Sequence, residues 1–122
     1  MDFSHMGPLV PDSEAKQIRT RLLERLEGFL FSDRSDAIPL ACRIEPTEHA
    51  DELQENWFLG VQSVIVYMEN YETMIRTTVP AVLQFLKARE SWQDFDLCIF
   101  DDEIRWCVAL THNDEAKRVT LE

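Results

Sequence analysis

FDLCIF at residues 95–100 and IRWCVAL at residues 104–110 are two runs of alternating side chains on either side of the acidic triplet DDE. Side chains alternate along a strand, so every second residue in each run points to the same side. The two runs therefore predict an antiparallel hairpin over residues 95–111, with the acidic triplet as its turn.

The length of the turn decides which residues of the hairpin lie opposite each other. A two-residue loop at 102–103 would place Ile99 opposite Trp106 and Leu97 opposite Val108. A four-residue loop would keep the same side chains on the core side, because a shift by an even number of residues preserves the faces.

Two stretches outside the hairpin have helical spacing. Residues 13–31 predict an amphipathic helix that begins at an Asp12-Ser13 cap. Residues 79–90 predict a second helix, with Thr77 or Thr78 as its cap and Pro80 near its first position. The apolar stripe of the first helix consists of Ile18, Leu22, Leu26, Phe29 and Leu30.

The remaining segments are less distinctive. Residues 59–68 are rich in β-branched side chains and favour a strand, although a helical face also fits them. Residues 69–77 have helical spacing and could continue into the following helix across a proline kink. Residues 37–44 favour a strand or an extended segment, and residues 48–57 favour a helix capped by Thr47. Near the end of the chain, we expect a polar turn at 113–118 and a short final strand at 119–121.

These elements predict an α+β fold, in which a small antiparallel sheet including the 95–111 hairpin packs with one face against two or three helices. The chain has 122 residues, a length that suits one domain. Gly7-Pro8 and Pro11 discourage regular structure near the start. We therefore expect a flexible N-terminal arm at 1–11 and a single domain at 12–122.

The balance of charge restricts the kinds of partner. The chain carries 23 acidic against 12 basic residues, a formal net charge of −11. This charge argues against direct binding of nucleic acid or of an anionic membrane, because both require Lys and Arg. It favours a basic protein as the partner.

Cys42, Cys98 and Cys107 are the three cysteines of the sequence. An odd number without a secretory signal favours reduced thiols and a cytoplasmic protein. In one register Cys98 and Cys107 would lie directly opposite across the hairpin, close enough to bond. Buried thiols that behave as small apolar residues are the favoured alternative.

The acidic residues gather in two places that we take as the candidate binding surface. In a helix over 48–57, four carboxylates would share one face, since they follow i, i+3, i+4, i+7 spacing. Trp57 would supply an aromatic anchor, a residue type enriched at interface hot spots. The predicted partner-binding residues are Glu48, Asp51, Glu52, Glu55, Trp57, Asp101, Asp102 and Glu103.

No spacing in the sequence specifies a catalytic or metal site. His112-Asn113-Asp114 and Glu48-His49 match no metal-binding pattern, and the acidic triplet lacks the glycine and alternating ligands of a calcium loop. The sequence therefore predicts no catalytic residue, no metal ligand and no cofactor.

The C-terminal stretch from Asp94 to Asp114 resembles the closing hairpin of small bacterial immunity proteins from polymorphic, contact-dependent-type toxin systems. The shared features are an aspartate-aromatic start, an acidic turn, a tryptophan on the return strand (Trp106) and a histidine-acid end. The resemblance covers about one-fifth of the chain and transfers no functional residue. It implies a cytoplasmic bacterial protein that neutralises a cognate toxin, often a basic nuclease, by covering its active site.

The sequence thus favours an acidic, non-enzymatic binding protein of the immunity or antitoxin type. An interaction or adaptor domain for another basic protein is the first alternative, and a small enzyme is the second.

Overall fold

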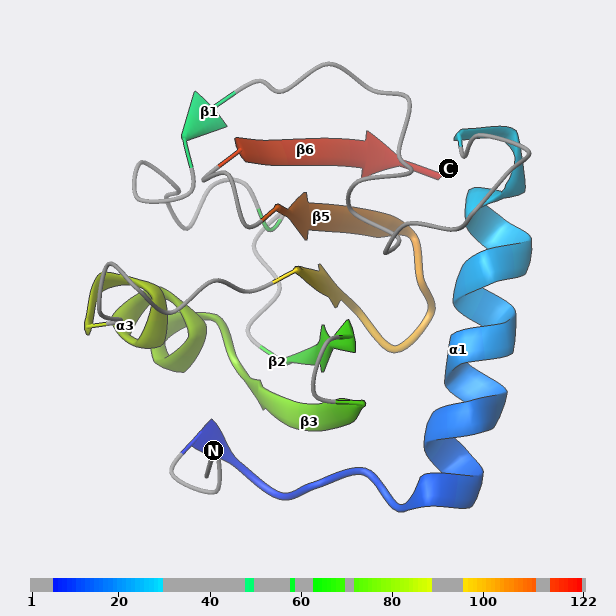
Figure 1. The fold of residues 1–122 in the computed structure, drawn as a ribbon, viewed down its shortest axis with the longest axis horizontal. Coiled ribbons are helices and arrows are strands. Elements are labelled where there is room, and N and C mark those ends of the chain that lie inside the picture. Colours follow the sequence, from blue (N-terminus) through cyan, green and yellow to red (C-terminus); the bar gives the residue numbers. More distant parts are fainter. Residues whose placement is uncertain are drawn as a thin grey trace.

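The computed structural model describes residues 6–29, 48–49, 58, 63–69, 72–88, 96–111 and 115–121. Within this part of the chain, two α-helices and a six-stranded antiparallel sheet form the α+β fold that the sequence predicts (Figure 1). The sheet has the order β1-β6-β5-β4-β2-β3. Its strands are β1 (Glu48–His49), β2 (Ser63–Met68), β3 (Thr73–Thr78), β4 (Leu97–Phe100), β5 (Trp106–Leu110) and β6 (Glu115–Thr120).

The predicted hairpin at the centre of the sheet is confirmed as β4 and β5. Ile99 pairs with Val108 and Leu97 with Leu110, which is the register of the longer loop. Cys98 lies opposite Ala109, so the expectation that it could face Cys107 directly is wrong. Both cysteines are buried thiols outside any disulfide, as expected for thiols that act as small apolar residues.

Helix α1 (Asp12–Leu26) covers one face of the sheet and is followed by a 3-10 turn, Glu27–Phe29. It begins after Pro11 without a side-chain cap, so the predicted Asp12-Ser13 cap is wrong. Each large apolar side chain it buries contributes about 1.5–3 kcal/mol. The buried residues of α1 and of the sheet face beneath it include Ile18, Leu22, Leu26, Ile65, Tyr67, Met74, Cys98, Phe100, Cys107 and Val119.

Helix α3 (Val79–Ala88) covers the opposite face, and Thr78 caps it by accepting a hydrogen bond from the Ala81 amide at 3.3 Å. The helix and its predicted cap are confirmed. The expectation that the helices cover one face is wrong, because alternate residues of β2 and β4 are buried under different helices (Figure 1). The core under α3 includes Val79, Val82, Leu86, Phe58, Val64, Val66, Met68, Ile75, Leu97, Ile99, Trp106, Val108 and Leu110.

Residues 63–68 form strand β2, as the sequence favoured, but the helical reading of residues 69–77 is wrong. Thr73–Thr78 form β3, which pairs with β2 along its whole length. A turn between the two strands is closed by the Glu72 amide, which donates to the Glu69 carbonyl at 3.1 Å. Both Met74 and Ile75 are buried because the two faces of β3 lie under different cores.

The N-terminal segment runs along the outer edge of β3 (Figure 1). The Val10 amide donates to the Met74 carbonyl at 2.9 Å, and the Arg76 amide donates to the Pro8 carbonyl at 3.1 Å. The Thr77 hydroxyl donates to the Met6 carbonyl at 2.5 Å. Residues 6–10 are therefore part of the sheet edge, which corrects the flexible arm expected there.

Two further expectations are corrected at the other edge of the sheet. Glu48 and His49 form β1 and pair with Ala116 and Glu115 of β6, so the helix expected over 48–57 does not include them. Residues 115–118 belong to β6, and the expected polar turn does not cover them. The expected extended segment at 37–44 lies outside the described residues.

Candidate functional site

The predicted acidic helical face is only partly within the described residues. Glu48 is in strand β1, where it cannot share a helical face with residues further along the chain. Asp51, Glu52, Glu55 and Trp57 lie outside the described residues. A helical face with i, i+3, i+4, i+7 spacing therefore cannot include Glu48.

Asp101 is a buried part of the β4–β5 turn and does not fit a docking surface. Only 3% of the residue is exposed. Its carboxylate accepts hydrogen bonds from the Arg105 amide at 2.8 Å and from Arg105 Nε at 2.7 Å. Its carbonyl accepts from the amide of Ile104, a buried β-branched residue with a φ of 52°. Such a φ is costly for a β-branched residue, so these bonds and the burial of Ile104 hold the turn in shape.

Asp102 and Glu103 are exposed at the tip of the same turn. The Asp102 carboxylate forms an ion pair with Arg76 of β3, and its carbonyl accepts from Arg21 of α1 at 3.2 Å. Arg76 also donates a hydrogen bond to Glu14 of α1 at 2.5 Å, and the bonds that it donates to Glu14 and to Asp102 raise the pKa of Arg76. The triplet therefore divides into one structural acid, one acid tied to an arginine and one exposed acid.

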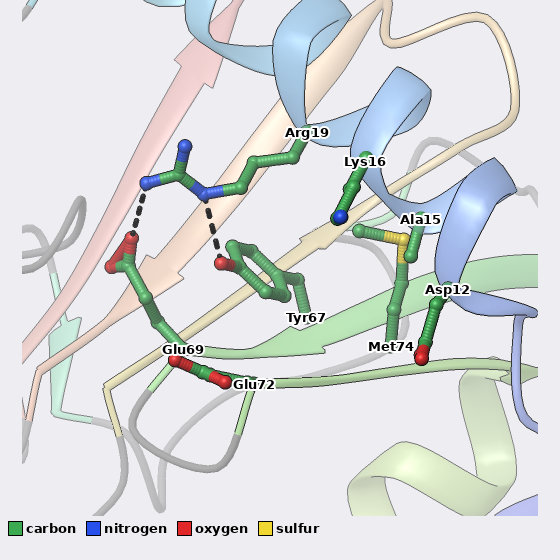
Figure 2. A pocket seen from close by; sticks show the side chains of 8 residues that line it. All are labelled: Asp12, Ala15, Lys16, Arg19, Tyr67, Glu69, Glu72 and Met74. Carbon is green, nitrogen blue, oxygen red and sulfur yellow. Dashed lines mark hydrogen bonds and ion pairs between the residues drawn. The ribbon is translucent and has the colours of Figure 1, made fainter.

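A pocket of about 460 Å³ lies between α1 and the end of the β2–β3 hairpin (Figure 2). One face of α1 forms its roof, the cross-strand pair Tyr67–Met74 forms its floor, and the β2–β3 turn closes one end. The lining residues are Asp12, Ala15, Lys16, Arg19, Tyr67, Glu69, Glu72 and Met74. None of them is among the partner-binding residues predicted from the sequence, although Glu69 and Glu72 belong to the acidic stretch between Ile44 and Ile75.

Arg19 joins the roof of the pocket to its floor. Its Nε donates a hydrogen bond to the Tyr67 hydroxyl at 2.9 Å, and its Nη2 lies 3.6 Å from Glu69 Oε1 (Figure 2). Tyr67 is 7% exposed. Burial raises the pKa of Tyr67 above its ordinary value, while the hydrogen bond and the charge of Arg19 act in the opposite direction. The phenol therefore stays neutral at physiological pH.

Three other charged side chains line the pocket without a partner among the described residues: Lys16, Asp12 and Glu72. All three are exposed. The ammonium of Lys16 extends from α1 toward the interior, whereas Glu72 lies on the strand side (Figure 2). Glu72 has a φ of 49°, a conformation that a non-glycine residue adopts at a cost. The pocket thus presents charges of both signs that no other side chain in the described part of the chain neutralises.

One sequence signal for this pocket was available. Asp12, Ala15, Lys16 and Arg19 follow i, i+3, i+4, i+7 spacing and so share one face of the first helix. This face is polar, and a polar helix face is ordinary on a protein surface. The spacing of residues 69–77 favoured a helix in place of β3, and no local pattern indicated that Tyr67 and Met74 would lie beneath this face.

The described residues contain no group of three or more His, Cys, Asp or Glu side chains arranged to hold a metal ion. No helix in the described ranges is long and apolar enough to cross a membrane. Comparison with protein-family models, with curated protein sequences and with solved structures gives no match.

Proposed function

We propose that this protein is an acidic, non-enzymatic binding protein whose partner is a basic protein. The partner we favour is a cognate bacterial toxin, such as a basic nuclease, whose active site the protein covers in the cytoplasm. The toxin is suggested by the resemblance of the 94–114 stretch to immunity proteins. The broader binding role rests on charge.

The observation that carries the proposal is the way the described arginines are used. Five of the six described arginines bind a carboxylate, a hydroxyl or a carbonyl of the protein itself, and thereby hold α1 or the β4–β5 turn in place: Arg19, Arg21, Arg25, Arg76 and Arg105. Cations committed to internal contacts are poorly placed to bind an anionic ligand. The acidic excess is left to set the field around the molecule.

Several acids are free to meet a partner. Asp12, Glu24, Glu27, Glu72 and Glu103 are all exposed. Such acids would attract a basic surface over about 10 Å at moderate ionic strength and would stand in for the phosphates that a nuclease site binds. We retain as partner-binding residues three acids that lie outside the described ranges: Asp51, Glu52 and Glu55. We exclude Asp101, because its carboxylate is buried.

Co-expression with a toxin domain, where the neighbouring gene encodes one, tests the proposal. Growth should be rescued, and the purified pair should dissociate steeply as salt rises from low to high concentration. Changing Asp51, Glu52 and Glu55 together to Lys should weaken the pair, whereas changing Asp101 to Asn should act through folding alone.

An adaptor domain for another basic protein is the alternative. It would show the same dependence on salt without any rescue of growth, so the two measurements together separate the two functions. Binding that does not change with salt would contradict both.

A further inference from the structure

We propose that the pocket between α1 and the β2–β3 hairpin binds a small zwitterion with an excess positive charge, of the class of a free basic amino acid. This ligand is independent of the protein partner proposed above. Three features of the pocket support this ligand: the charges that line it, the side chains of its floor, and its size.

The charges define what the ligand must carry. Arg19 and Glu69 lie within ion-pair distance of each other, so they largely offset one another. The remaining lining charges are one cation, Lys16, and two anions, Asp12 and Glu72. A ligand that complements this set has one carboxylate and two cationic groups. Free arginine and free lysine have this composition.

The floor of the pocket favours a carboxylate near α1. The Tyr67 hydroxyl accepts a hydrogen bond from Arg19, and its own proton has no acceptor among the described residues. A phenol can donate one hydrogen bond in addition to those it accepts. Tyr67 could therefore donate to the same carboxylate that Lys16 attracts.

The rest of the pocket suits an aliphatic stem with a cationic end. Met74 is almost fully buried and pairs with Tyr67 across the floor, so it offers a polarisable apolar surface. Asp12 and Glu72 would then meet the α-ammonium and the terminal cation. A volume of about 460 Å³ is sufficient for a ligand of this size, within the range of about 300–1,000 Å³ for small-molecule sites. The net charge of −11 also favours a ligand with an excess positive charge.

NMR titration at constant ionic strength tests the proposal, with the backbone amides of Ala15 and Met74 and the Arg19 Nε–H as reporters. Four probes separate the groups of the ligand. L-Arginine carries all three charges, L-citrulline lacks the terminal cation, and agmatine lacks the carboxylate. Nα-acetyl-arginine methylamide carries the guanidinium alone, as a partner protein's side chain would.

L-Arginine should give saturable shifts confined to the pocket reporters and should bind more tightly than the other three probes. Losing one charge should weaken binding by about two- to fivefold, because pairs this exposed to solvent are modest. Equal binding of citrulline or agmatine would overturn the proposal. Equal binding of the acetylated methylamide would also overturn it, in favour of a protein side chain as the occupant.

Substitutions in the pocket test which lining residue contacts the carboxylate of the ligand and which contacts its cationic groups. Lys16→Gln should weaken arginine binding but not agmatine binding, because agmatine has no carboxylate to lose. Glu72→Gln should weaken both. Lys87→Gln on α3 and Glu24→Gln outside the pocket are matched controls that should change neither. An equal effect of Lys16→Gln on both probes would contradict the assigned orientation, and the absence of saturable shifts with wild-type protein would overturn the site without touching the protein partner.

Discussion

The two faces of the sheet are built differently, although the same strands supply both. The face under α3 is covered by apolar side chains, with Phe58 against Trp106 at a ring-centroid distance of 5.6 Å. The face under α1 has an apolar centre with charged margins, where Arg19 and Arg76 bind acids and a phenol. The α3 face contributes packing, and the α1 face contributes packing together with a pocket whose charges at Asp12, Lys16 and Glu72 have no partner among the described residues. We therefore expect function to respond to the margins of α1 and stability to respond most to the core under α3.

The largest expected effect comes from Trp106→Ala in the core under α3. Trp106 is fully buried, so its truncation should lower the free energy of unfolding by about 3–5 kcal/mol, as measured by urea denaturation. Trp106→Phe keeps a ring beside Phe58 and removes an indole N–H that has no partner in the described part of the chain, so its loss should be smaller. A loss below about 1 kcal/mol for the alanine variant would show that this face is not the main source of stability.

Two neighbouring acids provide the next test, on the α1 side. Asp101→Ala should cost about 2 kcal/mol, because it removes the acceptor of two hydrogen bonds from Arg105 in a buried setting. Asp102→Ala should cost less than about 1 kcal/mol, since 65% of its side chain is exposed. Thermal and urea unfolding of both variants would compare them. Equal losses would contradict the division of the acidic turn into a structural and an exposed acid.

A smaller and more local effect is expected at the sheet edge, where Gly7 has a φ of 153°. A Cβ at this position would lie 2.1 Å from the Arg76 carbonyl oxygen, too close for the backbone to remain in place. Gly7→Ala should therefore detach the N-terminal segment from β3, at a cost of about 1–3 kcal/mol. Hydrogen exchange at the Val10 and Arg76 amides should become faster.

Gly28→Ala is the matched control, because a Cβ there meets nothing within 4 Å. It should leave the exchange of both amides unchanged. Slow exchange at Val10 in the Gly7→Ala variant would mean that the segment shifts to accommodate the side chain and stays hydrogen-bonded to β3.

The sequence predicted those elements whose pattern is local. The alternation in the 95–111 hairpin, the stripe of Ile18, Leu22 and Leu26, and the Thr78 cap all rest on neighbours within a few residues. The second covered face of the sheet was not predicted, although Cys98 and Phe100 are as apolar as the other residues of β4. Strands buried on both faces lose their polar alternation.

The rest could not be predicted because it depends on distant partners. Residues 73–78 contain β-branched residues that suit a strand, but the spacing of Tyr71 and Ile75 also fits a helix, and only pairing with β2 and the N-terminal segment decides between the two. The pocket requires α1 to cross β2 and β3, which is a matter of tertiary packing. Similarly, Asp101 has the composition of a turn acid, and only the fold shows that Arg105 binds it and that it is buried.

A small effect is also expected of Tyr67→Phe, which tests the margin of the α1 face by pH. At neutral pH the variant should lose about 1 kcal/mol, because Arg19 Nε no longer has a hydroxyl to donate to. The loss should be modest since Arg19 still lies 3.6 Å from Glu69.

The dependence on pH follows from burial, which raises the pKa of Tyr67 in the folded state above the ordinary value of 10.0. The stability linked to the neutral phenol is therefore fully present below about pH 10 and is lost as the pH rises through the folded-state pKa. Urea unfolding from pH 7 to 11 should show wild-type protein losing stability more steeply than Tyr67→Phe above pH 10, so the gap between them narrows. A gap that widens with pH would mean that Arg19 stabilises the phenolate more than burial destabilises it, and the margin of the α1 face would then be governed by charge pairing and not by burial.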